Sequence, residues 1–234
     1  MNSIALIVAG GEGSRMGSTL PKQFLLLCGR PLMMYTMEAF YFSKTRPEIL
    51  LVMHGDHLER WKETCQEYSF TLPHTLVSGG KNRSESVLKG LEHIENTKDR
   101  ENFPSYIAIH DAVRPLVSRG FLDSCFDFAI KNGNCLPGIP LRDSIRIIQN
   151  NVNKAMNRED FRLVQTPQIF RFNEILEAYK VNKFKHFSDD ASLMESMGHT
   201  IHLINGEEGN IKITFPIDLY LAEILLKEKE KNSI

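Results

Sequence analysis

The sequence predicts an α/β protein with a mostly parallel central sheet, and two observations carry this prediction. Short segments rich in Ile, Val and Leu recur along the chain, and segments with a helical spacing of apolar residues lie between them. This alternation is typical of repeated β-α-β units, whose crossover helices cover a parallel sheet. The strand-like segments are Ser3–Ala9, Ile49–Met53, His74–Ser78, Tyr106–His110 and Cys135–Ile139, and the helices between them span about 32–43, 56–68, 84–95 and 119–131.

The alternation stops after Pro140. Ser144–Ile148, a polar Asn150-Asn151 turn and Lys154–Met156 predict a hairpin that projects from the domain at about residues 141–160. We expect this β-arm to pack on a second subunit and to give a homodimer. The regular pattern then resumes, so we expect one domain over residues 1–234. Its later elements are helices near 173–182 and 190–197, strands at 200–204 and 211–214, and a closing helix from Pro216.

The composition is that of an ordinary globular protein and limits its partners. The 234 residues carry 28 Lys and Arg against 29 Asp and Glu, so the chain lacks the basic field that nucleic acid would require. No apolar run approaches the roughly 20 residues of a membrane span, and we expect neither a secretory leader nor a membrane partner. The four cysteines form no C-x-x-C pair, so we expect reduced thiols in a cytoplasmic protein.

A glycine-rich loop follows the first predicted strand, at the edge where open α/β sheets bind ligands. In Ala9–Gly17 the glycines would let backbone N–H groups approach phosphate oxygens. Two common nucleotide motifs do not fit, because Met16 stands where G-x-G-x-x-G needs glycine and the G-K-[ST] ending of a Walker loop is absent. The loop carries Arg15 and is followed by Pro21-Lys22-Gln23, so two cations flank its backbone amides, which favours phosphate binding. The alternative is a tight turn with two solvated cations.

A second glycine turn, Gly79-Gly80, leads into a predicted helix that carries Arg83 and Ser86 in its first turn. This arrangement could hold a base or a ribose. The alternative is a helix capped by Asn82 or Ser84, with Arg83 in water.

A carboxylate follows the strand at 106–110. Asp111, in the run His110-Asp111-Ala112-Val113-Arg114-Pro115, suits a ribose hydroxyl or a Mg²⁺ ion. The alternative is a turn in which Asp111 pairs with Arg114.

The second half of the chain adds weaker candidates. Ser144 and Arg158 bracket the arm, where an isolated Arg is more often a surface charge. Ser188–Ser192 reads first as a helix N-cap with acidic residues favoured by the helix dipole. Lys212 stands between apolar neighbours and therefore faces solvent or a cleft. His54 and His57 have no partners at zinc spacing, so we expect no metal site there.

Six motifs stand in order along the chain, and together they are far more specific than any one of them. The series closely resembles the 2-C-methyl-D-erythritol 4-phosphate cytidylyltransferase family over about residues 3–226. The ribitol-5-phosphate cytidylyltransferases share the glycine loop, the P-K-Q and the H-D-A-x-R-P. The motifs are Ala9-Gly10-Gly11-x-Gly13-x-Arg15-Met16, Pro21-Lys22-Gln23, Gly79-Gly80-x-x-Arg83-x-x-Ser86-Val87, His110-Asp111-Ala112-x-Arg114-Pro115, Gln165-Thr166-Pro167-Gln168 and Asn210-Ile211-Lys212-Ile213-Thr214.

The resemblance implies a Rossmann-like nucleotidyltransferase fold and a reaction of the mevalonate-independent isoprenoid pathway. CMP would pass from CTP to 2-C-methyl-D-erythritol 4-phosphate, with Mg²⁺ as cofactor, to give 4-CDP-2-C-methyl-D-erythritol and pyrophosphate. Carried over by position, Arg15, Lys22 and Lys212 would be catalytic. CTP would be bound by Ala9, Gly10, Gly11, Gly13, Gly80, Arg83, Ser86, Asp111 and Ala112, with Asp111 also near the metal. Ser144, Arg158, Thr166 and Ser188 would hold the sugar phosphate, and the two arm residues, Ser144 and Arg158, would serve the partner subunit's site.

The chain departs from the family pattern at a few positions. Ser144 and Ser188 stand where Thr is usual, which keeps the hydroxyl. Lys81, Asn157 and Gly209 replace residues that are commonly acidic or polar, so the contacts of the loop at Lys81 are less defined by the resemblance.

Two other functions remain open from the sequence. Ribitol 5-phosphate is the alternative acceptor, although Asp189-Asp190-Ala191-Ser192 looks like the methylerythritol family, since ribitol enzymes tend to carry a T-D-A-C-like version there. A catalytically silent CTP-binding module is the other alternative. The presence of Lys22, Arg158 and Lys212 argues against it, because these residues would serve the attacking substrate and the transferred phosphate.

Overall fold

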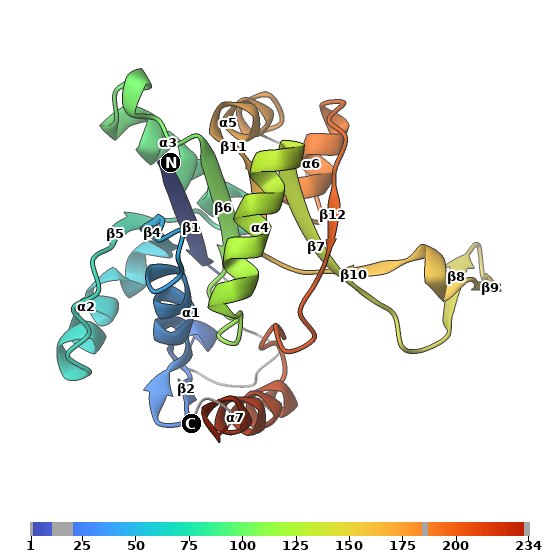
Figure 1. Ribbon diagram of the computed structural model, residues 1–234, viewed down its shortest axis with the longest axis horizontal. Coiled ribbons are helices and arrows are strands. Elements are labelled where there is room, and N and C mark those ends of the chain that lie inside the picture. Colours follow the sequence, from blue (N-terminus) through green and yellow to red (C-terminus); the bar gives the residue numbers. More distant parts are fainter. Residues whose placement is uncertain (1, 11–20, 184–186, 232–234) are drawn as a thin grey trace.

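The computed structural model describes residues 2–10, 21–183 and 187–231, which form an eight-stranded mixed sheet between helices (Figure 1). The strand order is β10-β7-β11-β6-β1-β4-β5, and β12 adds to β7. β1, β4, β5 and β6 are parallel, as expected, whereas β10 and β11 run antiparallel to their neighbours. The strands are β1 Ser3–Ala9, β4 Glu48–Met53, β5 Thr75–Ser78, β6 Tyr106–Asp111, β7 Asn134–Pro140, β10 Arg162–Val164, β11 Gln168–Arg171 and β12 Leu203–Asn205.

Helices cover both faces of the sheet, because side chains of the central strands alternate between two cores. In β1, Ala5 and Ile7 pack with the helices on one face, whereas Leu6 and Val8 pack with those on the other. The first face carries α1 Leu32–Tyr41, α2 Leu58–Glu67 and α4 Arg119–Asn132, and the second carries α3 Arg83–Thr97, α5 Phe172–Val181 and α6 Asp190–Ser196. The α/β class is thus confirmed.

A third, smaller core lies beyond the carboxyl end of β1. Ile213 and Ala222 pack there with Leu27, Leu32 and Leu116. It joins the last helix, α7 Pro216–Lys231, to the small pair β2 Leu26–Leu27 and β3 Arg30–Pro31 (Figure 1). The short 3-10 turns are η2 Lys22–Phe24, η3 Gly55–His57, η4 Arg100–Asn102 and η5 Arg158–Asp160.

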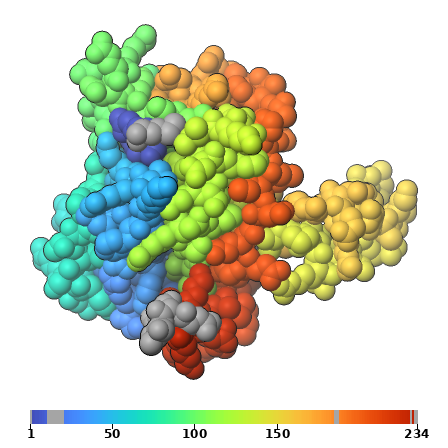
Figure 2. All heavy atoms as spheres, in the orientation of Figure 1, coloured from blue at the N-terminus to red at the C-terminus, as the bar shows by residue number. Residues whose placement is uncertain are grey.

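The predicted arm is a two-stranded hairpin that stands away from the body of the molecule (Figures 1 and 2). β8 Ile145–Gln149 pairs with β9 Val152–Met156. The connecting residues Asn150 and Asn151 both have positive φ, 49° and 61°, a conformation that Asn tolerates and that a two-residue hairpin turn requires. The arm leaves Ile148 76% and Val152 69% exposed.

Two sequence predictions fail in the second half of the chain. Residues 211–214 alternate as a strand would, but they form no strand; the Ile213 N–H donates to the Val113 carbonyl at 2.9 Å. The strand expected at 200–204 begins only at Leu203. β10 and β11 were not predicted, because each is too short to show a periodicity and is fixed by pairing with β7 or β6.

Gly90 of α3 lets the helix approach the sheet closely. A Cβ there would lie 2.6 Å from Leu6 Cδ1 and 3.0 Å from Val52 Cγ2. We predict that Gly90→Val lowers the free energy of unfolding by at least about 2 kcal/mol, because the core must shift to accept the side chain.

Gly120, in the first turn of α4, is the matched control, since a Cβ there meets nothing within 4 Å. Gly120→Val should change the unfolding free energy by less than about 0.5 kcal/mol. Urea denaturation of both variants measures the difference, and equal effects would contradict the close packing of α3.

Candidate active site

The site lies where adjacent parallel strands end. β1 and β6 pair in register with Val8 opposite Asp111, so the residues after β1 and the end of β6 meet at one edge. The Gln23 side chain donates to the Ala9 carbonyl at 2.8 Å, which holds the buried Lys22 beside the end of β1. The Pro21-Lys22-Gln23 motif thus has a structural basis in the end of β1.

Two hollows of about 160 and 260 Å³ open at this edge. Both are lined by Arg83, Asp111 and Lys212. The smaller hollow also contains Val8, Ala9, Gly10, Lys22, Gln23 and Val113, and the larger contains Arg114, Val164, Gln165, Thr166, Gln168, Ser188 and Asp189. The glycine-loop residues and the second-half residues therefore line neighbouring hollows that share three charged side chains.

The Asp111 carboxylate is at the centre of this arrangement. Its Oδ1 accepts from Arg83 Nε at 3.1 Å, and its Oδ2 lies 2.8 Å from Lys212 Nζ and 3.6 Å from Arg114 Nε. Burial by itself raises the pKa of Asp111, but the positive charges of Arg83, Lys212 and Arg114 outweigh it and hold that pKa well below the usual range. Asp111 is therefore ionised at any working pH. The Asp111–Arg114 turn pair that the sequence offered as an alternative is present.

Arg83 joins the two halves of the site. While Nε meets Asp111, Nη1 and Nη2 donate to both oxygens of the fully buried Asp190, at 3.0 and 2.7 Å. The Tyr179 hydroxyl also donates to Asp190. Asn82 caps α3, as the sequence suggested, but Arg83 is not a solvated side chain. This corrects the alternative interpretation, because a planar guanidinium between two carboxylates is a fixed structural element.

Asp190 was missed as a site residue. The Ser188–Ser192 segment does form the predicted N-cap: Asp189 accepts from the Ser192 N–H at 3.0 Å, and Ser192 returns a capping-box bond. No local pattern indicated that the second acidic residue turns inward, because its partner, Arg83, is 107 positions away.

Gly10 and the Gly79-Gly80 turn both lie close to the Ser86 hydroxyl. Ser86 Oγ donates to the Asn82 carbonyl at 2.9 Å and accepts from the Gly80 N–H at 3.1 Å. A Cβ at Gly10 would lie 2.9 Å from this oxygen, and one at Gly79 would lie 2.7 Å from it. These turns approach so closely only because they lack side chains.

Other candidate residues lie beneath the site or away from it. Ala112 is fully buried, and its N–H donates to the Val8 carbonyl at 3.0 Å. Ser144 and Arg158 are exposed and line neither hollow; Arg158 Nη1 donates to the Arg142 carbonyl at 2.7 Å. Gly11, Gly13 and Arg15 lie outside the described residues.

The three unusual positions have different surroundings. The Lys81 N–H donates to Glu85 at 2.9 Å, and the Asn157 side chain caps η5 through the Glu159 N–H. A side chain at Gly209 would meet nothing within 4 Å, so the backbone does not require glycine there.

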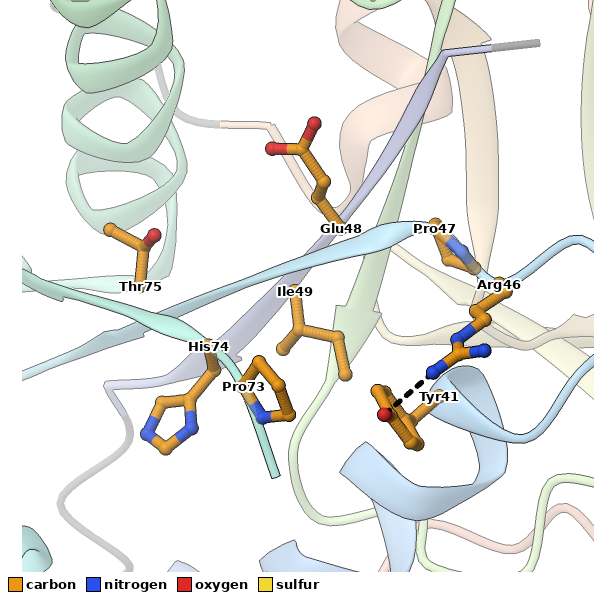
Figure 3. Close-up of a pocket in the computed structure, with 8 residues that line it drawn as sticks. All are labelled: Tyr41, Arg46, Pro47, Glu48, Ile49, Pro73, His74 and Thr75. Atoms are coloured by element: carbon orange, nitrogen blue, oxygen red, sulfur yellow. Dashed lines mark hydrogen bonds between the residues drawn. The ribbon is translucent and has the colours of Figure 1, made fainter. Parts of the chain in front are cut away.

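A larger hollow, of about 450 Å³, lies at the other end of the strands, where β4 and β5 begin (Figure 3). Arg46 lines it and donates to the Tyr41 hydroxyl at 2.6 Å, while His74 accepts from the Trp61 indole at 2.9 Å. Size alone would select this hollow. The smaller pair carries the cations and the glycine turns, and we place the chemistry there.

Within residues 2–10, 21–183 and 187–231, no group of three or more His, Cys, Asp or Glu could hold a metal ion. No helix among these residues is long and apolar enough to cross a membrane.

Fold and site together define a class. A glycine turn at the end of a parallel strand, next to a pocket lined by several cations, is typical of an α/β protein that binds a phosphate or a nucleotide. A family model described as 2-C-methyl-D-erythritol 4-phosphate cytidylyltransferase matches residues 3–228. The chain belongs to this family, as its six ordered motifs predicted.

Curated relatives of the same name agree over nearly the full length. Those from Azobacteroides pseudotrichonymphae genomovar. CFP2 and Porphyromonas gingivalis (strain ATCC 33277) are 43% and 42% identical, over 94% and 95% of this chain and 97% and 96% of theirs.

Solved structures are similar as well. The 4-diphosphocytidyl-2C-methyl-D-erythritol synthase of Anaerococcus prevotii has a TM-score of 0.80 at 25% identity, covering 97% of this chain and 96% of that one. The 2-C-methyl-D-erythritol 4-phosphate cytidylyltransferase of Thermus thermophilus has 0.72 at 29%, covering 95% and 98%. The predicted nucleotidyltransferase fold is thus confirmed.

We predict that Asp190→Asn destabilises the fold by about 3 kcal/mol or more, because it removes the charge of the fully buried carboxylate that both Nη atoms of Arg83 meet and leaves only Asp111 to balance the guanidinium. Asp189→Asn is the matched control, since Asn is also a good N-cap, and it should cost no more than about 1 kcal/mol. Urea midpoints of the two variants give the comparison. Equal midpoints would show that the buried pair contributes nothing beyond the cap.

Proposed function

We propose that the protein transfers the cytidylyl group of CTP to 2-C-methyl-D-erythritol 4-phosphate, releasing pyrophosphate. Membership of the cytidylyltransferase family supports this reaction, and ribitol 5-phosphate is not favoured by it. The observation that carries the proposal is the position of Lys212 and Asp111, which line both hollows. A group bound there can meet a nucleotide on one side and a second substrate on the other.

The reaction requires positioning and charge neutralisation rather than a general base. A phosphate oxygen of the acceptor, already anionic at pH 7, forms a bond to the α-phosphorus of CTP as the bond from that phosphorus to the pyrophosphate oxygen breaks. No proton has to move. The protein therefore contributes in-line alignment and positive charge on the α-phosphate and the departing pyrophosphate.

In this proposal Lys22, Arg15 and Lys212 supply that charge. Lys22 is buried beside the end of β1, where the triphosphate would follow the first glycine loop. Lys212 reaches the junction of the hollows and would exchange its contact with Asp111 for one with phosphate. Arg15 is proposed from the family motif alone.

The nucleotide would lie over the glycine turns. Gly10, Gly80 and Ser86 would surround the base, together with Ala9, Gly11 and Gly13, and Asp111 and Ala112 would lie near the ribose. Since both hydrogen bonds of Ser86 are made within its own turn, we assign it the shaping of the base site. Arg83 is fixed by two carboxylates. Besides its contact with CTP, it would hold Asp111 in place.

Magnesium remains part of the proposal. Asp111 is the carboxylate in the described site that could face it, yet three cations already surround this group. These residues do not fit a protein-built Mg²⁺ cage. We therefore propose that phosphate oxygens and water hold the ion, a common arrangement for Mg²⁺, and no step above depends on it.

The acceptor would occupy the hollow of about 260 Å³ in the candidate site, beside Thr166, Ser188 and Lys212. We propose that Ser144 and Arg158 complete this site in a partner chain, within a homodimer built through the β-arm. Two facts support this: both residues lie outside the hollows of their own chain, and the arm exposes Ile148 and Val152. We place the enzyme in the cytoplasm, without nucleic acid or membrane partners.

Pyrophosphate release tests the reaction. We predict release with CTP and 2-C-methyl-D-erythritol 4-phosphate, and a loss of roughly 10²- to 10³-fold in kcat for Lys22→Ala, because a preorganised cation is removed from the triphosphate. Lys98→Ala, which alters a lysine paired with Glu48 at the far edge of the sheet, should keep full activity.

Release with ribitol 5-phosphate in place of the methylerythritol substrate would identify the other acceptor. Binding of CTP without turnover of either would identify a silent module. A near-normal kcat for Lys22→Ala would remove that lysine from the mechanism.

Subunit mixing tests the arm. In a dimer of one Lys22→Ala chain and one Arg158→Ala chain, one site combines an intact core with an intact arm. Random mixing of the two inactive variants should therefore restore about a quarter of wild-type activity, since half the dimers are mixed and each has one working site. Activity no higher than that of the parents would show that each arm serves its own chain.

A further inference from the structure

A buried histidine lies directly beneath the hollow of about 260 Å³ that Thr166 and Lys212 line. His110 of β6 has no exposed surface, and its ring meets the Phe40 ring edge-on at 5.1 Å. Its Nδ1 lies 3.0 Å from Thr166 Oγ1, and its Nε2 lies 3.4 Å from the Arg114 carbonyl oxygen. The mechanism above does not use this residue.

The surroundings determine which ring nitrogen carries the proton. Burial lowers the pKa of His110 to about 3, an effect that the charge of Asp111 opposes and that of Arg114 reinforces, so the ring is neutral with a single N–H. A backbone carbonyl can only accept, and therefore Nε2 is the protonated nitrogen facing Arg114. Nδ1 is then an acceptor. The hydroxyl of Thr166 must donate to it.

The remaining capacity of Thr166 follows from its contacts. A hydroxyl has one proton and two acceptor positions. The proton goes to His110, and one acceptor position takes the Asp111 N–H at 3.1 Å. One acceptor position therefore remains on Thr166, which lines the hollow of about 260 Å³ together with Lys212.

This arrangement selects the kind of ligand atom that Thr166 can meet. A phosphate dianion has no proton to give, and turning the Thr166 hydroxyl toward it would leave the buried Nδ1 without a donor, which is unfavourable. A ligand hydroxyl can donate to the free position at no such cost. Resting on the proposed function, we infer that His110 is a positioning residue that fixes Thr166 as the acceptor for a hydroxyl of the sugar-phosphate carbon chain, not for its phosphate.

Single-deoxy analogues of the acceptor provide the first test. One analogue, lacking the hydroxyl that meets Thr166, should show a kcat/KM about tenfold or more below that of the full substrate with the wild-type enzyme. In Thr166→Val this penalty should fall to within about twofold, whereas Thr166→Ser should keep it. If no analogue loses its penalty in Thr166→Val, the inference is overturned, because Thr166 then meets the phosphate or no part of the substrate.

Two variants of the histidine test its role. His110→Phe keeps the ring volume and the contact with Phe40 but removes Nδ1, and we expect the wild-type penalty to fall at least threefold. His110→Asn can place an amide oxygen near the position of Nδ1, and it should restore the wild-type penalty for the deoxy analogue. A merely structural role would lower stability in both without changing discrimination among analogues, and that result would also overturn the inference.

Two further measurements separate the explanations. The shape of the pH profile of kcat/KM between pH 6 and 8 should be the same in wild type and His110→Asn; a shifted limb would show a titrating His110 and contradict the fixed acceptor. Calorimetric binding of the acceptor and its analogues, with α,β-methylene CTP present, repeats the comparison without turnover. Wild-type turnover with unchanged discrimination in the variants refutes this inference alone, whereas no acceptor binding by wild type refutes the proposed function together with it.

Discussion

The site depends on one buried carboxylate that keeps several cations together. Arg83 and Lys212 line both hollows, Lys22 lines the smaller one and Arg114 the larger one, and like charges gathered in one site repel one another. Asp111 lies against three of them, and Asp190 balances Arg83 from the other side. Four cations against the three carboxylates Asp111, Asp189 and Asp190 leave a positive pocket on a chain whose overall charge is -1. A nearly neutral protein can thus attract a triphosphate without a basic surface.

The same carboxylates connect parts of the chain that are distant in sequence. Arg83 begins α3, Asp111 ends β6, and Asp190 begins α6. The Arg83 guanidinium meets both carboxylates at once, and a planar donor set held in this way has little rotational freedom. The hollow beside the glycine turns and the hollow beside Thr166 are therefore held at a fixed separation, which is what an in-line transfer between two bound substrates needs.

Much of this architecture could be predicted from the sequence, and the exceptions have physical causes. The central strands were found because their Ile, Val and Leu runs are buried on both faces, and the site was found because glycines follow β1. β11 could not be found, since a four-residue strand is defined by its pairing with β6 rather than by its own pattern. Asp190 was not predicted as a site residue, because the helix N-cap at its neighbour Asp189 already accounted for the acidic pair. The alternation at Lys212 left open whether that side chain faces solvent or a cleft, and the structure places it at the two hollows. The strand that the same alternation predicted does not form. The family motifs supplied the substrates, which no periodicity could.

Ser86 limits which residues can replace two glycines that are distant in the sequence, Gly10 and Gly79. Its hydroxyl lies within 3 Å of where a Cβ would stand at Gly10 and at Gly79. A change at any of these three positions alters the room available to the others, so they form one unit of sequence constraint although they belong to different turns. A larger residue at 86 would be accepted only with a displaced turn. Descendants of this chain should therefore gain a side chain at position 10 or 79 only together with a change at position 86, and such joint variation would mark reshaped turns at this edge of the sheet.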